Sequence, residues 1–163
     1  MNINIREYEN HDKAMLISCM EGLQQHIVDI DPLHRQIISI GYGEKYTDEL
    51  LKNIKERKGK IYLAEIDSKV IGCIAGNPQP EPKGGTLEVV PTNPAWIREL
   101  YVDSEYRGRG IGTLLMDKLE EYFKVIGCDV VQVGVFAPNL DTHNFYKTKG
   151  YVDRDITMLK KIN

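Results

Sequence analysis

The sequence has few of the residues that mark a secreted, metal-binding or membrane-spanning protein. Its three cysteines, Cys19, Cys73 and Cys128, are scattered, odd in number and without a CxxC pair. This spacing argues against a zinc site and is typical of small buried residues in a reducing compartment. The most apolar run, VIGCIAG at 70–76, is far shorter than the roughly 20 residues of a spanning helix. The N-terminal MNINIREYEN lacks the apolar core of a signal peptide. We therefore expect a cytoplasmic protein with no metal and no membrane segment.

An excess of basic charge is also lacking. Lys and Arg number 21 against 24 Asp and Glu, which gives a net charge of −3. Nucleic-acid-binding domains are strongly basic, and attraction to anionic lipid also needs positive charge, so we expect neither partner. The 163 residues, 42% of them hydrophobic, suit one domain with a packed core. The sequence thus predicts a single domain over 1–163.

Periodicity and turn residues predict an α/β protein of mixed type. The hairpin-linked strands imply antiparallel pairs, and a strand-helix-strand unit in the second half implies a parallel crossover. We expect a mixed, mostly antiparallel sheet with helices on both faces, in which the β-branched run 130–136 is a central strand and 77–85 a surface loop. The expected strands are 2–7, 60–66, 70–76, 86–90, 96–102, 130–136 and 151–159, and the expected helices are one from near Asp12 to Asp31, then 47–58, 110–124 and 139–149.

A glycine-rich turn separates the strand at 96–102 from the next helix. Residues 102–112 read VDSEYRGRGIG, with three glycines within five residues. Glycine lets backbone N–H groups approach a ligand closely, and a helix N-terminus favours an anion. Arg107 and Arg109 add positive charge. The spacing matches neither the dinucleotide fingerprint nor the P-loop. A phosphate-bearing ligand explains this turn better than tight chain reversal alone.

These residues carry a family resemblance. The pattern V-x-x-x-x-R-G-x-G-I-G at 102–112 resembles the acyl-CoA-binding motif of the GNAT superfamily of N-acyltransferases. Residues 139–151 resemble that family's N-x-x-A-x-x-x-Y-x-x-x-G-[FY] signature, with Thr142 where the family often has Ala. The two motifs, joined by a helix and a strand, make a close match over 96–151. The resemblance implies the GNAT fold, acetyl-CoA as co-substrate, and a homodimer as one possible assembly.

The resemblance also assigns binding roles to individual positions. It implies that backbone amides from Arg107 to Thr113 bind the pyrophosphate, that the preceding strand pairs with the pantetheine arm, and that Asn139 meets that arm. Asn139 equally fits a helix N-cap, and both roles can hold. The implied cofactor-binding residues are Leu100, Tyr101, Val102, Arg107, Gly108, Arg109, Gly110, Ile111, Gly112, Thr113, Asn139 and Tyr146.

Tyr146 matches the family's general acid. A phenol with a pKa near 10 is protonated at neutral pH and can donate to a leaving thiolate. The alternative is a core aromatic. Because Phe145 and Tyr146 point about 100° apart on a helix, we expect only one of them to face the core.

Glu99 is the candidate general base. Strand alternation predicts that its side chain shares a face with Ile97 and Tyr101. A cross-strand charge pair is an equally good reading. Glu88 is a weaker candidate, and we do not assign His143 as a base.

The function these residues imply is transfer of an acetyl group from acetyl-CoA to a primary amine, by direct attack in a ternary complex. The acceptor is a small amine or a protein or peptide amine. The segment 26–46, with its carboxylates and tyrosines, is expected to shape a site for a cationic amine. The alternative is a non-catalytic acyl-CoA-binding module on the same fold, and a purely structural protein would bind no CoA. The presence of Tyr146 and Glu99 favours the enzyme.

Overall fold

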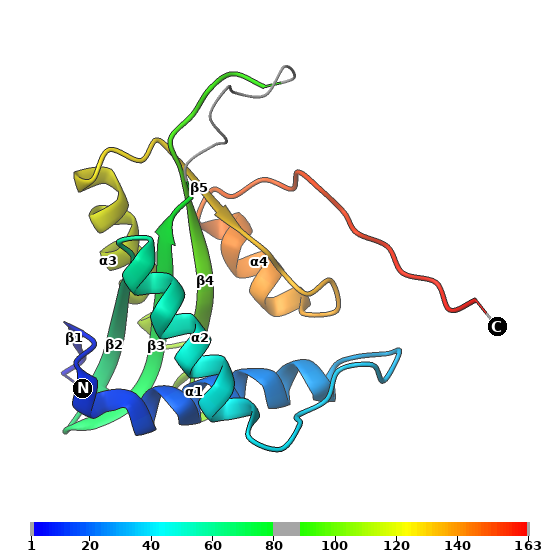
Figure 1. The fold of residues 1–163 in the computed structure, drawn as a ribbon, viewed down its shortest axis with the longest axis horizontal. Coiled ribbons are helices and arrows are strands. Elements are labelled where there is room, and N and C mark those ends of the chain that lie inside the picture. The colour runs from blue at the N-terminus through cyan, green and yellow to red at the C-terminus, as the bar shows by residue number, and fades with distance from the viewer. Residues whose placement is uncertain (1, 80–88, 163) are drawn as a thin grey trace.

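A five-stranded sheet forms the centre of the computed structural model, which describes residues 2–79 and 89–162 (Figure 1). The strands lie in the order β1-β2-β3-β4-β5. The first four pair antiparallel, and β5 pairs parallel to β4. The predicted mixed, mostly antiparallel sheet is therefore confirmed. The strands are β1 (Asn4–Glu7), β2 (Lys60–Ile66), β3 (Lys69–Pro78), β4 (Pro94–Val102) and β5 (Val130–Val133).

Helices cover both faces of the sheet, as predicted (Figure 1). Two helices, α1 and α2, cover one face, α3 covers the other, and α4 lies beside β5. Short 3₁₀ turns at Asn10–Asp12 and Ser104–Tyr106 precede α1 and the glycine-rich turn. The α-helices are α1 (Lys13–Asp29), α2 (Tyr42–Glu56), α3 (Ile111–Val125) and α4 (Leu140–Thr148).

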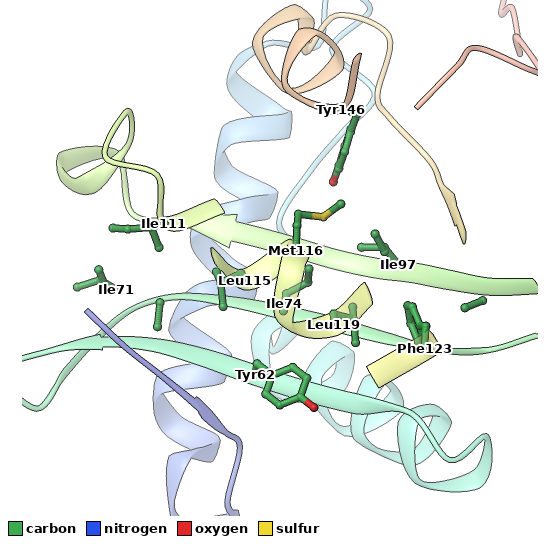
Figure 2. Close-up of a cluster of buried hydrophobic side chains, with 12 residues drawn as sticks. Tyr62, Ile71, Ile74, Ile97, Ile111, Leu115, Met116, Leu119, Phe123 and Tyr146 are labelled. Atoms are coloured by element: carbon green, nitrogen blue, oxygen red, sulfur yellow. The ribbon is translucent and has the colours of Figure 1, made fainter. Parts of the chain in front are cut away.

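Two apolar layers hold the helices against the sheet. Residues of α3 such as Leu115, Leu119 and Phe123 pack on Ile74 and Ile97 (Figure 2). The layer beneath α1 and α2 contains Leu16, Cys19, Met20, Leu50, Ile54, Ile61, Leu63, Cys73 and Ala75. Cys19 and Cys73 are buried as predicted, whereas Cys128 is only half-buried. Burial of each large apolar side chain contributes about 1.5–3 kcal/mol, so both layers fix the helices that carry the site.

The structure corrects two predictions about the C-terminal part of the chain. β5 is an edge strand that ends at Val133, not a central strand over 130–136. Residues 151–162 form no strand, and 152–162 are exposed. A strand forms only where a neighbouring ladder satisfies its backbone groups, and in the described structure this segment is paired with no strand.

Helix α2 begins at Tyr42, five residues before the predicted start. Gly41, with φ of 73°, is the residue that precedes the helix. Thr47, the expected cap, is instead buried inside the helix. Most of the expected loop at 77–85 and of the strand at 86–90 lies outside the described residues, and Val89 and Val90 are not in a strand.

Neither a membrane span nor a metal centre is found in the described part of the chain. No helix within 2–79 and 89–162 combines the length and apolar character that a bilayer crossing needs. Within the same ranges, no group of three or more His, Cys, Asp or Glu is arranged to hold a metal ion.

Candidate functional site

Strand β4 separates from β5 halfway along its length. The two strands pair from Pro94 with Val130 to Ile97 with Val133. β4 then continues to Val102, paired with β3 on its other side. Beyond Ile97, the edge of β4 faces a cavity of about 850 Å³ instead of a neighbouring strand. Backbone groups at such an edge can pair with an extended ligand, as they do with an added strand.

The cavity brings together nearly all of the residues that the two motifs implied. Arg109 is the exception, because it does not line the cavity. It donates from its guanidinium to the Glu105 carbonyl at 3.0 Å and lies 5.5 Å from the Tyr106 ring centre. The implied residues that line the cavity are Glu99, Leu100, Tyr101, Val102, Arg107, Gly108, Gly110, Ile111, Gly112, Thr113, Asn139 and Tyr146.

The glycine turn presents the N-terminus of α3 to this cavity. Gly108 and Gly110 have φ of 72° and 80°, in the left-handed region that favours glycine. A Cβ at either position would meet nothing within 4 Å, so glycine is needed for the backbone and the space beside it is open. The first-turn amides of α3, at Ile111 to Thr113, have no acceptor within the helix. They form, with the helix dipole, a site suited to phosphate.

Gly112 lies where α3 meets α4. A Cβ there would lie 3.4 Å from the Phe145 ring, at ordinary van der Waals distance. The two helices that carry the motifs are therefore in contact beside the cavity.

Asn139 caps helix α4 and also lies at the cavity. Its side-chain oxygen accepts from the Thr142 backbone N–H at 3.3 Å, which caps α4. The N-cap role is therefore confirmed. Asn139 also lines the cavity, so its remaining polar groups are positioned beside the ligand space.

A β-bulge in β4 determines where Glu99 points. Ile97 pairs with Gly76 and Glu99 pairs with Ala75, so Arg98 is an extra residue on β4. Such a residue reverses the alternation of side chains. Ile97 therefore packs under α3, whereas Glu99 lies on the face covered by α1 and α2. The expectation that Glu99 shares a face with Ile97 is wrong.

The side chain of Glu99 contacts α2 instead of a cross-strand cation. It accepts a hydrogen bond from the Tyr46 hydroxyl. Arg98 is directed elsewhere, donating to Asn77 Oδ1 at 2.9 Å and to Gln79 Oε1 at 2.6 Å. Burial raises the pKa of Glu99 to about 6, although the Tyr46 hydrogen bond and the Arg98 charge oppose the shift. The group can thus take up a proton near neutral pH.

Tyr146 faces the same cavity from α4. It is only 5% exposed, and its side chain lies at one end of the cluster shown in Figure 2. Burial, and then the nearby Glu99 charge, raises the pKa of its phenol well above the usual value. Tyr146 therefore keeps its proton at neutral pH.

Tyr146 and Phe145 both contact the core, contrary to expectation. Tyr146 belongs to the cluster under α3, and Phe145 packs against the same cluster with its ring centre 5.5 Å from that of Tyr146. Helix α4 meets α3 at Gly112, and its Tyr146 belongs to the same cluster against which Val135, after β5, also packs. Side chains about 100° apart on α4 can therefore both reach apolar surface.

The segment 26–46 contributes to the cavity, but not through the expected carboxylates. The members of this segment that line it are His26, Ile27, Gln36, Tyr42 and Tyr46. Asp31 is buried outside the cavity and accepts from the backbone N–H groups of 33, 35 and 36 at 2.6 to 3.0 Å, which fixes the loop. Short-range loop chemistry therefore accounts for this carboxylate.

Two further lining residues come from the C-terminal half of α1 and lie outside the predicted segment 26–46: Leu23 and Gln24. Their apolar and amide side chains look like ordinary helix positions in the sequence. Only the packing of α1 against β4 reveals their place, and we find no sequence signal that would have singled them out.

Comparison with known proteins assigns the chain to a family. Residues 27–151 match the model of the acetyltransferase (GNAT) family, and the chain belongs to this family. An uncharacterised N-acetyltransferase of Methanocaldococcus jannaschii is 31% identical over 114 residues, which cover 67% of this chain and 48% of that protein. A second from the same organism is 34% identical over 97 residues, or 59% and 54% of the two chains. The chain spans about half the length of these curated relatives.

Solved structures confirm the predicted fold. A predicted acetyltransferase with acetyl-CoA from Clostridium acetobutylicum superposes with a TM-score of 0.75 at 19% identity, covering 98% of this chain and 96% of that one. Glucosamine-6-phosphate N-acetyltransferase from Arabidopsis thaliana gives 0.68 at 17% identity, with full coverage of both chains (100% each). At such low identity the likeness concerns the fold alone.

Proposed function

We propose that this protein transfers an acetyl group from acetyl-CoA to a primary amine in a ternary complex. One observation carries the proposal. Glu99, with a pKa of about 6, and Tyr146, whose phenol stays protonated, face one cavity at the point where β4 leaves β5. Two groups whose environments push their pKa values apart are suited to the roles of base and acid. Membership of an acetyltransferase family supports this assignment.

The residues around the cavity fit acetyl-CoA. The amides of Ile111 to Thr113 at the start of α3 bind the diphosphate, and the open space beside Gly108 and Gly110 admits it. The backbone of β4 at 100–102 pairs with the amide-containing pantetheine arm. Bound in this way, acetyl-CoA supplies an activated thioester.

The amine acceptor binds between β4 and the two helices α1 and α2. Tyr42 offers an aromatic face, Leu23 offers apolar surface, and Gln24 offers an amide. Aromatic faces attract ammonium groups. A primary amine on a partly apolar body, either a small molecule or a peptide side chain or terminus, suits this lining.

Glu99 and Tyr146 then divide the proton transfers. Glu99 takes a proton from the ammonium group, directly or through one water, and the free amine forms a bond to the thioester carbon. As the C–S bond breaks, Tyr146 donates its proton to the departing sulfur. The nitrogen then loses a second proton, and Tyr146 regains a proton through solvent. Glu99 releases to water the proton that it took from the ammonium group. The balance is one amide, one free thiol and one proton.

Thiol release from acetyl-CoA, measured over a panel of amines, tests the proposed function. We expect thiol release with at least one primary amine, matched by an acetylated product of the corresponding mass. CoA binding without thiol release for any amine would favour the alternative, a non-catalytic acyl-CoA-binding module. Failure to bind CoA would contradict both.

We also propose that 1–163 is one cytoplasmic domain and that two copies form a homodimer through an edge of the sheet. β1 and β5 are the two edges of the described sheet, and unpaired edges are ready for pairing with another chain. Sedimentation analysis tests the assembly, with a single monomeric species counting against it.

A further inference from the structure

We propose that Tyr46 is a positioning residue for Glu99: its hydroxyl holds one carboxylate oxygen so that the other faces the acceptor amine. This inference rests on the proposed function. Tyr46 lies on α2, outside both sequence motifs. It lines the cavity, and its hydroxyl contacts Glu99 on β4.

The hydrogen bond joins two groups that are far apart in the sequence. Tyr46 donates its hydroxyl proton to Oε1 of Glu99. A carboxylate oxygen bound in this way has a fixed direction, because the donor lies along one lone pair. Rotation of the carboxylate about its last bond is then restricted. Its second oxygen, Oε2, is the one available to a substrate proton.

The Tyr46 ring is fixed by packing that does not involve its hydroxyl. It stacks on Tyr42, one helical turn earlier, with ring centres 5.2 Å apart and planes 22° apart. It also packs against the apolar layer beneath α1 and α2. The donor is therefore held in place before any ligand binds, as a preorganised support requires.

The first turns of α2 pack against α1. Gly43 is buried there, and a Cβ at this position would meet only the end of the flexible Glu21 side chain of α1. Tyr46 lies one turn further on, so the packing of α2 against α1 contributes to its position above β4.

The hydrogen bond also opposes the effect of burial on Glu99. Burial alone would favour the neutral acid, whereas a donor to the charged form favours the carboxylate. The other groups that act on or face Glu99 are Arg98 on β4, Tyr42 on α2, Tyr146 on α4, Cys73 on β3 and His26, which lines the same cavity. Arg98 also favours the charged form, but it is directed toward Asn77 and Gln79.

Tyr46→Phe tests the proposal, because it keeps the stacked ring and removes only the donor. The control is Tyr122→Phe on α3, outside the cavity, which removes the hydrogen bond that the Tyr122 hydroxyl donates to the Lys58 carbonyl. Two quantities are measured on the full chain. One is the titration of the Glu99 carboxyl carbon by NMR with labelled glutamate, assigned with Glu99→Gln. The other is the pH profile of kcat/KM.

We expect Tyr46→Phe to move the Glu99 titration upward by about one pH unit, and with it the acid limb of kcat/KM. Activity below pH 6 then falls about tenfold relative to wild type, while the KM for acetyl-CoA stays the same. Tyr122→Phe leaves both midpoints in place. In the Glu99→Gln background, Tyr46→Phe causes no further loss, because the residue acts through Glu99.

An unchanged titration in a folded Tyr46→Phe protein would overturn the proposal, as would an equal further loss in the Glu99→Gln background. A wild-type protein that acetylates no amine would overturn the proposed function and the positioning role with it. In that case the NMR titration still reports the hydrogen bond, so the two failures are distinguishable.

Discussion

Ile97 and Glu99 lie two positions apart on β4, yet their side chains point to opposite faces of the sheet. Arg98 between them is the extra residue of a β-bulge. Pairing between β4 and β5 ends at Ile97, immediately before this bulge. The same irregularity thus coincides with the opening between the strands and turns the Glu99 carboxylate toward Tyr46. Bulges commonly redirect a side chain beside a functional site in this way.

Replacement of Glu99 tests the general base. Glu99→Gln should lower kcat/KM by about 10²–10⁴-fold. In the wild type, the base works only when ionised, so kcat/KM should fall as the pH drops through the pKa of about 6. The variant should lose this limb. Glu120→Gln is the matched control, because this α3 carboxylate accepts a hydrogen bond from Tyr151 and does not line the cavity. If kcat/KM of Glu99→Gln still fell as the pH drops through about 6, the titrating group would be one other than Glu99.

Replacement of Tyr146 tests the general acid. Tyr146→Phe keeps the buried ring and removes the proton donor, so kcat should fall about 10²-fold or more while CoA affinity changes little. Tyr151→Phe removes a neighbouring hydroxyl, which donates to Glu120 at 2.8 Å, and should leave kcat near the wild-type value. Steady-state kinetics with calorimetric CoA binding checks both variants. Equal kcat in Tyr146→Phe and wild type would remove the acid role.

The glycine turn can be tested separately from the chemistry. Gly110→Asp places a negative charge where the diphosphate is expected, and CoA should bind at least tenfold more weakly, or about 1.4 kcal/mol. Gly150→Asp is the matched control, because Gly150 also has a positive φ of 87° and open space around it. Both changes strain the backbone, but only Gly110 lines the cavity. Similar CoA affinities of the two variants, measured by calorimetry, would show that the turn does not bind the phosphate groups.

A buried ion pair near the N-terminus makes a prediction about stability. Arg6 donates to both carboxylate oxygens of Asp12, at 2.7 and 2.8 Å, and Asp12 is fully buried. The Arg6 hydrogen bond lowers the pKa of Asp12 to about 2 from 3.8. A lowered pKa means that this stabilisation is present above about pH 4 and is lost as the pH falls toward 2.

Asp12→Asn should therefore lower the free energy of unfolding at neutral pH by about 3 kcal/mol, as expected when one partner of a buried pair is removed. Urea denaturation at several pH values measures this difference, which should narrow between pH 4 and 2. Asp117→Asn, at an exposed pair with Lys149, should cost less than about 1 kcal/mol. If the free energy of unfolding of Asp12→Asn were lower than that of the wild type by the same amount at every pH, the ionic origin of the effect would be contradicted.

The sequence predicted the parts of the site that depend on local chemistry. The Gly108–Gly112 turn and the Asn139 cap are short-range features, and the structure brings both to one cavity. The face of the sheet on which the Glu99 side chain lies could not be predicted, because the bulge depends on the pairing register between β4 and β3. Likewise, Tyr46 enters the site only through the packing of α2 over β4.

The strands at the end of the chain were predicted less well for the same reason. Residues 130–136 and 151–159 both have strand-forming composition, but composition does not report which neighbour supplies the ladder. β5 has β4 on one side only, and the tail beyond Tyr151 is not paired in the described structure.

Hydrogen–deuterium exchange with and without CoA is the most direct test of the central claim, that the free edge of β4 and the start of α3 bind one CoA. We predict slower exchange in the bound protein over 98–102 and 108–113, with one CoA bound per chain by calorimetry. The segment 60–66, on the far side of β3, should exchange at the same rate in both states. A folded protein that gives neither binding heat nor protection in these two segments at millimolar CoA would contradict the account.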